Sequence, residues 1–75
     1  MADIRVLFGR ALRRLRLKQG ISQEGFALKA KINRSYMGRI ERGEVNLSLD
    51  NIQKVAKGLG MSVGRLMMEV DGGGE

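Results

Sequence analysis

The sequence predicts one compact all-α domain of five helices. Apolar residues recur at spacings of three and four in several segments, which is the pattern of amphipathic helices. An Asp, Ser or Asn precedes each of these segments and a glycine follows three of them, so helix ends are marked as well. There is no proline, no internal repeat and no linker long enough to separate two domains. A chain of 75 residues is also near the lower limit for a single hydrophobic core.

The first helix is predicted over residues 3–18. Asp3 is a suitable N-cap, and Gly20 suits the left-handed position that follows a helix end. The apolar side of this helix contains Ile4, Leu7, Phe8, Ala11, Leu12 and Leu15. The other side is basic, and we expect it to be a solvated surface rather than a binding patch. It carries Arg5, Arg10, Arg13 and Arg14.

Two short helices follow. Ser22 caps the first, which ends near Ala30 and has a short apolar stripe that includes Phe26. Asn33 caps the second, which is predicted over residues 34–42 and closed by Gly43. Met37 and Ile40 point to one side of this second helix. The opposite side carries Arg34, Ser35, Gly38 and Arg39.

The last two helices begin after Ser48 and Ser62, both good N-caps. Apolar residues at helical spacing are Leu49, Ile52, Val55, Ala56 and Leu59 in the first, and Val63, Leu66 and Met67 in the second. We place the domain at residues 1–70. Residues 71–75 are expected to be a disordered tail, because three glycines and two acidic residues have too little to bury.

Composition excludes several classes of function. The chain has no Cys and no His, so disulfides, thiolate nucleophiles, the usual zinc sites and imidazole bases are absent. We find no acid–base pair, nucleophile or metal cluster, and therefore predict no enzyme activity, no cofactor and no metal. No run approaches the roughly 20 apolar residues of a membrane span, and no secretory leader is apparent. The protein is expected to be soluble and cytoplasmic, without a membrane partner.

The charge is unevenly distributed. Residues 1–42 contain 11 Lys and Arg against 3 Asp and Glu, whereas residues 43–75 contain 3 against 5. The first part thus has a net charge of +8 and the second of −2, which gives +6 for the chain. Such asymmetry of charge is expected if residues 1–42 face a polyanion. DNA phosphate is the commonest polyanion for a basic domain. RNA binding and mere solubility remain alternatives at this point.

The helices of residues 22–30 and 34–42 match a helix-turn-helix in size and in their short connection. Helical hairpins are common, so the exposed side chains decide the interpretation. Arg34 and Ser35 begin the second helix and Arg39 follows about one turn later, where a recognition helix places the residues that touch base edges in the major groove. Because the fork of an arginine matches the O6 and N7 acceptors of guanine, the pattern favours sequence-specific binding of double-stranded DNA.

Residues 7–68 resemble the phage-repressor-like helix-turn-helix domains of the Cro and cI type, also called Xre-like. The segments that carry this resemblance are Phe8-Gly9, Leu15-Arg16, Gly20-Ile21-Ser22-Gln23-Glu24, Phe26-Ala27, Ile32-Asn33-Arg34-Ser35-Tyr36, Ile40-Glu41-Arg42-Gly43 and Ile52-Gln53-Lys54-Val55-Ala56. Residues 34–43 together with Asn46-Leu47-Ser48-Leu49 look most like the controller proteins of restriction-modification systems. The resemblance implies a lambda-repressor-like five-helix fold and a homodimer on a pseudo-palindromic operator. It also implies a regulator that activates at low occupancy and represses at high occupancy, with RNA polymerase as a further candidate partner.

The resemblance also implies roles for single residues. Gln23 is expected to bond a phosphate, and Arg16 and Glu41 to form a partly buried, structural ion pair. The expected DNA-binding residues are Ser22, Gln23, Asn33, Arg34, Ser35, Tyr36, Arg39, Arg42 and Asn46. We expect Tyr36 to be exposed for a groove contact. Val45 departs from the family, because some controllers carry a basic residue there, and Gly25 departs because a helix former is usual.

Met61, Met67 and Met68 are suited either to core packing or to a dimer contact. A homodimer through the last two helices is expected, because one helix-turn-helix covers few base pairs and a two-fold dimer sets two recognition helices about 34 Å apart. An antitoxin-type autorepressor and a general phage or plasmid repressor of the same fold are alternatives. An adaptor for RNA or protein is disfavoured, since it would not need Arg34 and Arg39 on an exposed face.

Overall fold

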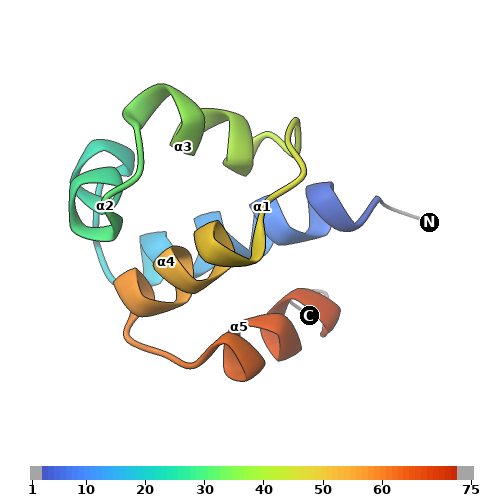
Figure 1. Ribbon diagram of the computed structural model, residues 1–75. Coiled ribbons are helices and arrows are strands. Elements are labelled where there is room, and N and C mark those ends of the chain that lie inside the picture. The colour runs from blue at the N-terminus through green and yellow to red at the C-terminus, as the bar shows by residue number, and fades with distance from the viewer. Residues whose placement is uncertain (1–2, 73–75) are drawn as a thin grey trace.

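The computed structural model describes residues 3–72, in which five helices and no strand are found (Figure 1). The helices are α1 (Ile4–Lys18), α2 (Gln23–Ala30), α3 (Arg34–Glu41), α4 (Leu49–Leu59) and α5 (Val63–Asp71). The predicted all-α class is confirmed, and the helix bounds agree with the expected ones to within a residue or so. Over this part of the chain, no helix has both the length and the apolar character needed to cross a membrane.

Each helix begins where a polar side chain caps it. An oxygen of the capping side chain accepts a hydrogen bond from a backbone N–H two or three residues later, at 2.8 to 3.1 Å. These capping residues are Asp3, Ser22, Asn33, Ser48 and Ser62. Gly20, Gly43 and Gly60 follow helix ends with positive φ, as predicted. A side-chain acceptor at this position satisfies one of the unpaired N–H groups of the first turn, so the sequence fixes where each helix starts.

Two helix ends differ from expectation. Residue Arg42, expected inside the third helix, is instead the C-cap that follows Glu41. Helix α5 continues through Asp71, one residue beyond the expected domain end, and Gly72 caps it. Val70 is 1% exposed, so the last turn of α5 is held by core packing rather than left to fray. The rest of the expected tail, residues 73–75, lies outside the described residues.

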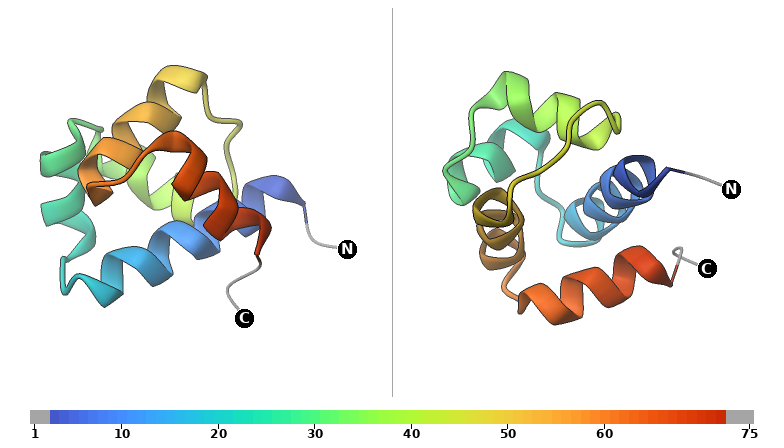
Figure 2. Two further views of the ribbon diagram at one scale, coloured as in Figure 1. Left: turned by 90° about the horizontal axis from the view of Figure 1, so that it is seen from below. Right: turned by 45° about the vertical axis from the view of Figure 1, so that its right-hand side comes forward.

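The core lies between α1 and α4 and joins all five helices. Helix α1 packs against α3, α4 and α5, while α2 packs against α3 and α4. The largest fully buried side chains are Phe26, Leu12, Met37, Ile40, Leu66, Val55 and Val70. Helices α3 and α5 lie at opposite ends of the molecule, with α1 and α4 between them (Figures 1 and 2). The surfaces of α3 and α5 are therefore separate and can serve different partners.

Candidate nucleic-acid interface

Helices α2 and α3 are joined by a tight turn of three residues. Lys31 ends α2 in the left-handed conformation, with φ of 58°, and its N–H donates to the carbonyls at the end of that helix. Ile32 is buried, and its N–H donates to the Ala27 carbonyl at 2.9 Å. Asn33 then caps α3. The turn is thus held by backbone hydrogen bonds and one buried side chain, so it fixes the direction of α3 relative to α2.

The outer side of α3 presents two arginines and a serine. Arg34, Ser35 and Arg39 are all exposed, with 72% of the Arg34 side chain and 53% of the Arg39 side chain accessible to solvent. Arg34 forms an ion pair with Glu24 of α2. Gly38, expected on the same open side, is buried, because the side chains of Arg42 and Gln23 lie over it. The guanidinium groups on α3 remain available at the surface.

Glu44 lies between two arginines, Arg39 and Arg42. Arg42 Nε donates to Glu44 Oε2 at 2.8 Å, and Arg39 Nε lies 3.9 Å from Glu44 Oε1. The hydrogen bond from Arg42 lowers the pKa of Glu44 below its usual value, so Glu44 is ionised at neutral pH. Asn46 is exposed in the connection between α3 and α4. Phosphate oxygens can replace Glu44 on both arginines, since carboxylate and phosphate accept in the same geometry.

Gln23 belongs to a hydrogen-bonded network beneath this surface. Arg16 Nε donates to Glu41 Oε2 at 2.6 Å and Arg16 Nη2 donates to Glu41 Oε1 at 3.0 Å, with only 8% and 5% of the two side chains exposed. The remaining terminal nitrogen of Arg16 donates to the Ile21 carbonyl at 2.9 Å, and Gln23 Nε2 donates to Glu41 Oε1 at 3.1 Å. The expected ion pair between Arg16 and Glu41 is present. It ties the end of α1 and the start of α2 to the end of α3.

Three of the predicted DNA-binding residues already make contacts within the domain. The side-chain oxygens of Ser22 and Asn33 accept the capping hydrogen bonds of α2 and α3. Tyr36 was expected to be exposed, but it is half-buried and packs against the hydrophobic core. Its ring lies near the core because Tyr36 stands four residues, about one turn, before the buried Ile40 and directly before the buried Met37. A role in DNA binding is confined to the part that remains accessible.

The helix-turn-helix family model matches residues 12–66. The chain is 48% identical to control protein C.BamHI from Bacillus amyloliquefaciens, over 79% of this chain and 74% of that protein. It is also 45% identical to the restriction-modification controller protein C.AhdI from Aeromonas hydrophila, whose crystal structure superposes with a TM-score of 0.79 over 83% of this chain and 94% of that one. The chain belongs to the helix-turn-helix family of restriction-modification controllers.

A second similar structure shows such a controller with DNA. The protein C.Esp1396I bound to a 25 base pair operator site is 25% identical and has a TM-score of 0.86, over 97% of this chain and 96% of that chain. The phage-repressor-like family and the controller group named from the sequence are therefore both confirmed. The shared fold includes the α2–α3 unit, on which all the predicted DNA-binding residues except Arg42 and Asn46 lie, and these two follow it directly.

Arg13 is a candidate DNA contact that was not predicted from the sequence of this controller. It lines a hollow of about 210 Å³ together with Arg16, Gln23, Glu41 and Arg42, next to the predicted phosphate contact Gln23. Arg13 was assigned to a solvated helix surface. A signal was present, because Arg13 stands one turn before Arg16, and the partner of Arg16 is the last residue of α3. This spacing turns Arg13 toward the helix-turn-helix.

Proposed function

We propose that this chain is the controller protein of a restriction-modification system, a transcriptional regulator that binds operator DNA as a homodimer with α3 in the major groove. The observation that carries the proposal is the outer side of α3, where Arg34, Ser35 and Arg39 are exposed together. Gln23 and Arg42 flank this side, next to the hollow that contains Arg13. Base edges are read by the residues of α3, while the flanking residues position the helix on the phosphates.

The arginines exchange partners when DNA binds. Arg34 leaves Glu24, and Arg39 and Arg42 leave Glu44, for base edges or phosphates. Exposed ion pairs of this kind contribute little to stability, so their loss costs little when the partner is DNA. Each phosphate contact releases a counterion, and operator affinity accordingly falls steeply with salt.

Arg34→Ala is expected to weaken binding to the preferred DNA by about 2 kcal/mol, or about thirtyfold in Kd, because a bidentate contact to guanine is lost. The DNA is a duplex selected by the wild-type chain from a random pool, compared with a shuffled duplex of the same composition. Fluorescence anisotropy gives both affinities. Lys18→Ala, which removes an exposed cation at the end of α1, is the control and should change neither by much. Equal losses on the two duplexes would refute base readout by Arg34.

The homodimer uses α4 and α5 in our proposal, and the apolar surface of α5 supports it. Met68 is 70% exposed and Val63 is 37% exposed, whereas Met61 and Met67 are half-buried against the core. Met68 and Ile4 both line a hollow of about 350 Å³ between the start of α1 and α5. On α4, Leu49 is 82% exposed. A two-fold contact at this end leaves α3 open at the other end, as a pseudo-palindromic operator requires.

Met68→Lys is expected to dissociate this dimer, because burial of each Met68 contributes about 2 kcal/mol and the two-fold axis applies the change twice. Sedimentation equilibrium measures the association, and circular dichroism checks the fold. Leu28→Lys, which replaces an exposed apolar residue of α2, is the matched control and should leave the dimer intact. A variant at position 68 that associates as tightly as the wild type would place the interface elsewhere.

A further inference from the structure

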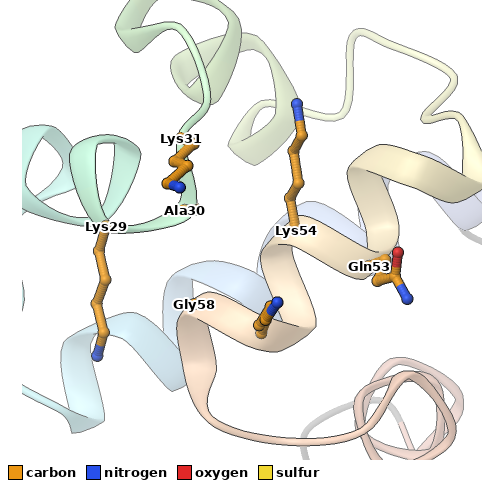
Figure 3. A pocket seen from close by; sticks show the side chains of 7 residues that line it. Lys29, Ala30, Lys31, Gln53, Lys54 and Gly58 are labelled. Carbon is orange, nitrogen blue, oxygen red and sulfur yellow. The ribbon is translucent and has the colours of Figure 1, made fainter.

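A basic hollow that contains none of the predicted DNA-binding residues lies between the end of α2 and one side of α4 (Figure 3). It has a volume of about 450 Å³. The residues that line it are Lys29, Ala30, Lys31, Gln53, Lys54, Lys57 and Gly58, and we call it the lysine hollow. Four of the seven are lysines and none is acidic. None of the seven belongs to the predicted DNA-binding residues, so the function proposed above leaves this hollow unexplained.

The floor of the lysine hollow is tightly packed and has no charge of its own. Ala30 and Gly58 are buried there. A Cβ on Gly58 would lie 3.0 Å from Phe26 Cζ and 3.1 Å from the Ala30 Cβ, so the backbone of α4 rests directly on α2. The four lysines around this floor are all exposed. None of the residues that line the hollow supplies a negative charge.

The lysines of the hollow differ from the arginines of the DNA interface in their pairing. Arg34, Arg39 and Arg42 each have a carboxylate of this chain as partner. Within residues 3–72, the ion pairs that form include none of the four lysines of the hollow. Gathering four like charges without counter-charges raises the electrostatic energy of the chain. A partner with several carboxylates lowers that energy, which is the complementarity expected of a docking surface.

Lys31 adds a second observation. It holds the left-handed conformation at the end of α2, with φ of 58°, where a glycine would be unstrained. A side chain there costs on the order of 1 kcal/mol. At this strained position, the side chain of Lys31 lines the lysine hollow. Retained backbone strain of this kind is a reason to look for a function of the side chain.

We infer that the lysine hollow is a docking site for an acidic segment of a protein partner. The side chains favour separated carboxylates over one phosphate group, because Lys29 and Lys54 extend in opposite directions in Figure 3 instead of converging on a point. The aliphatic stems of the lysines, with Ala30, offer apolar contact between the charges. Gln53 offers an amide to the backbone of the segment. The hollow shares no residue with the predicted DNA-binding set, so an acidic segment bound there leaves those residues free for DNA.

The test is a titration of the full chain with a synthetic peptide of glutamate, alanine and leucine, followed by NMR of backbone amides. We expect the largest shifts at the residues of the lysine hollow. The double variant Lys54→Gln/Lys57→Gln should weaken peptide binding about fivefold, as expected for the loss of two partly exposed ion pairs. The matched control Arg10→Gln/Lys18→Gln removes the same charge from exposed positions of α1 and should weaken it less than twofold.

Two further measurements separate this site from other anion binding. The double variant Lys54→Gln/Lys57→Gln should bind the operator about as tightly as the wild type does. This expectation holds whether or not α3 is the helix that reads the bases. A fall as large as that for the peptide would make the lysine hollow a DNA contact and overturn the inference. Tripolyphosphate should produce weaker and more scattered shifts than the peptide. Tighter binding of tripolyphosphate at the hollow, peptide shifts spread over all basic surfaces, or no peptide binding would each overturn the inference as well.

Discussion

Replacing Glu41 with alanine is expected to destabilise the domain by about 4 kcal/mol, because it leaves the Arg16 guanidinium buried without its counter-charge. Arg16 is 6% exposed and donates to both carboxylate oxygens of Glu41, at 2.6 and 3.0 Å. The substitution also removes the acceptor for Gln23 Nε2. A domain of this size has a free energy of unfolding of about 5 to 15 kcal/mol, so the loss is a large share of it. Urea denaturation followed by circular dichroism measures it.

Two variants make this expectation specific. Glu44→Ala removes a carboxylate from an exposed pair with Arg42 and should leave the unfolding midpoint nearly unchanged. Arg16→Met/Glu41→Leu removes both charges together and should be considerably more stable than Glu41→Ala, since no charge is then stranded. If Glu41→Ala unfolds at the same urea concentration as Glu44→Ala, the network between α1, α2 and α3 contributes little to stability.

The helix starts could be predicted from sequence because their cause is local. Each depends on one side-chain oxygen and an N–H two or three residues later, as at Ser48 and Asn51. The apolar spacing of α1 and α4 likewise identifies the core side of each helix before the partner helix is known. The pair of Arg16 and Glu41 joins residues 25 positions apart. It was expected only from the resemblance to a family, since no local pattern links the two residues.

The features that were not predicted from the sequence depend on how the helices pack against one another. Tyr36 is half-buried because it lies on the side of α3 that packs against the core, and Gly38 is buried under the side chains of Gln23 and Arg42. Arg13 faces the helix-turn-helix only once α1 and α3 are packed. The lysine hollow joins the end of α2 to α4, two segments separated by the whole recognition helix. No property of either segment alone indicates the site.

The position of α3 on the domain depends on one close contact of two backbones. A Cβ on Gly9 of α1 would lie 2.5 Å from the Ile40 carbonyl oxygen and 2.6 Å from that of Glu41. These atoms belong to the last turn of α3, and a backbone carbonyl cannot rotate away as a side chain can. Glycine at this position therefore sets how closely the recognition helix approaches α1, and with it the alignment of the Arg16 and Glu41 side chains.

Gly9→Ala is accordingly expected to destabilise the domain by about 3 kcal/mol, near the upper end for overpacking, in spite of the better helix propensity of alanine. It should also weaken operator binding, because α3 has to shift relative to α2 to admit the methyl group. Thermal unfolding and anisotropy with the selected duplex measure the two effects. Gly64→Ala is the matched control for the unfolding measurement alone, because Gly64 lines the hollow beside Met68. The nearest atom to a Cβ there is Ser62 Oγ at 4.0 Å, and the substitution should stabilise α5 by up to about 1 kcal/mol. A Gly9→Ala variant as stable as Gly64→Ala would mean that α1 and α3 can separate without loss, and that their contact does not position the recognition helix.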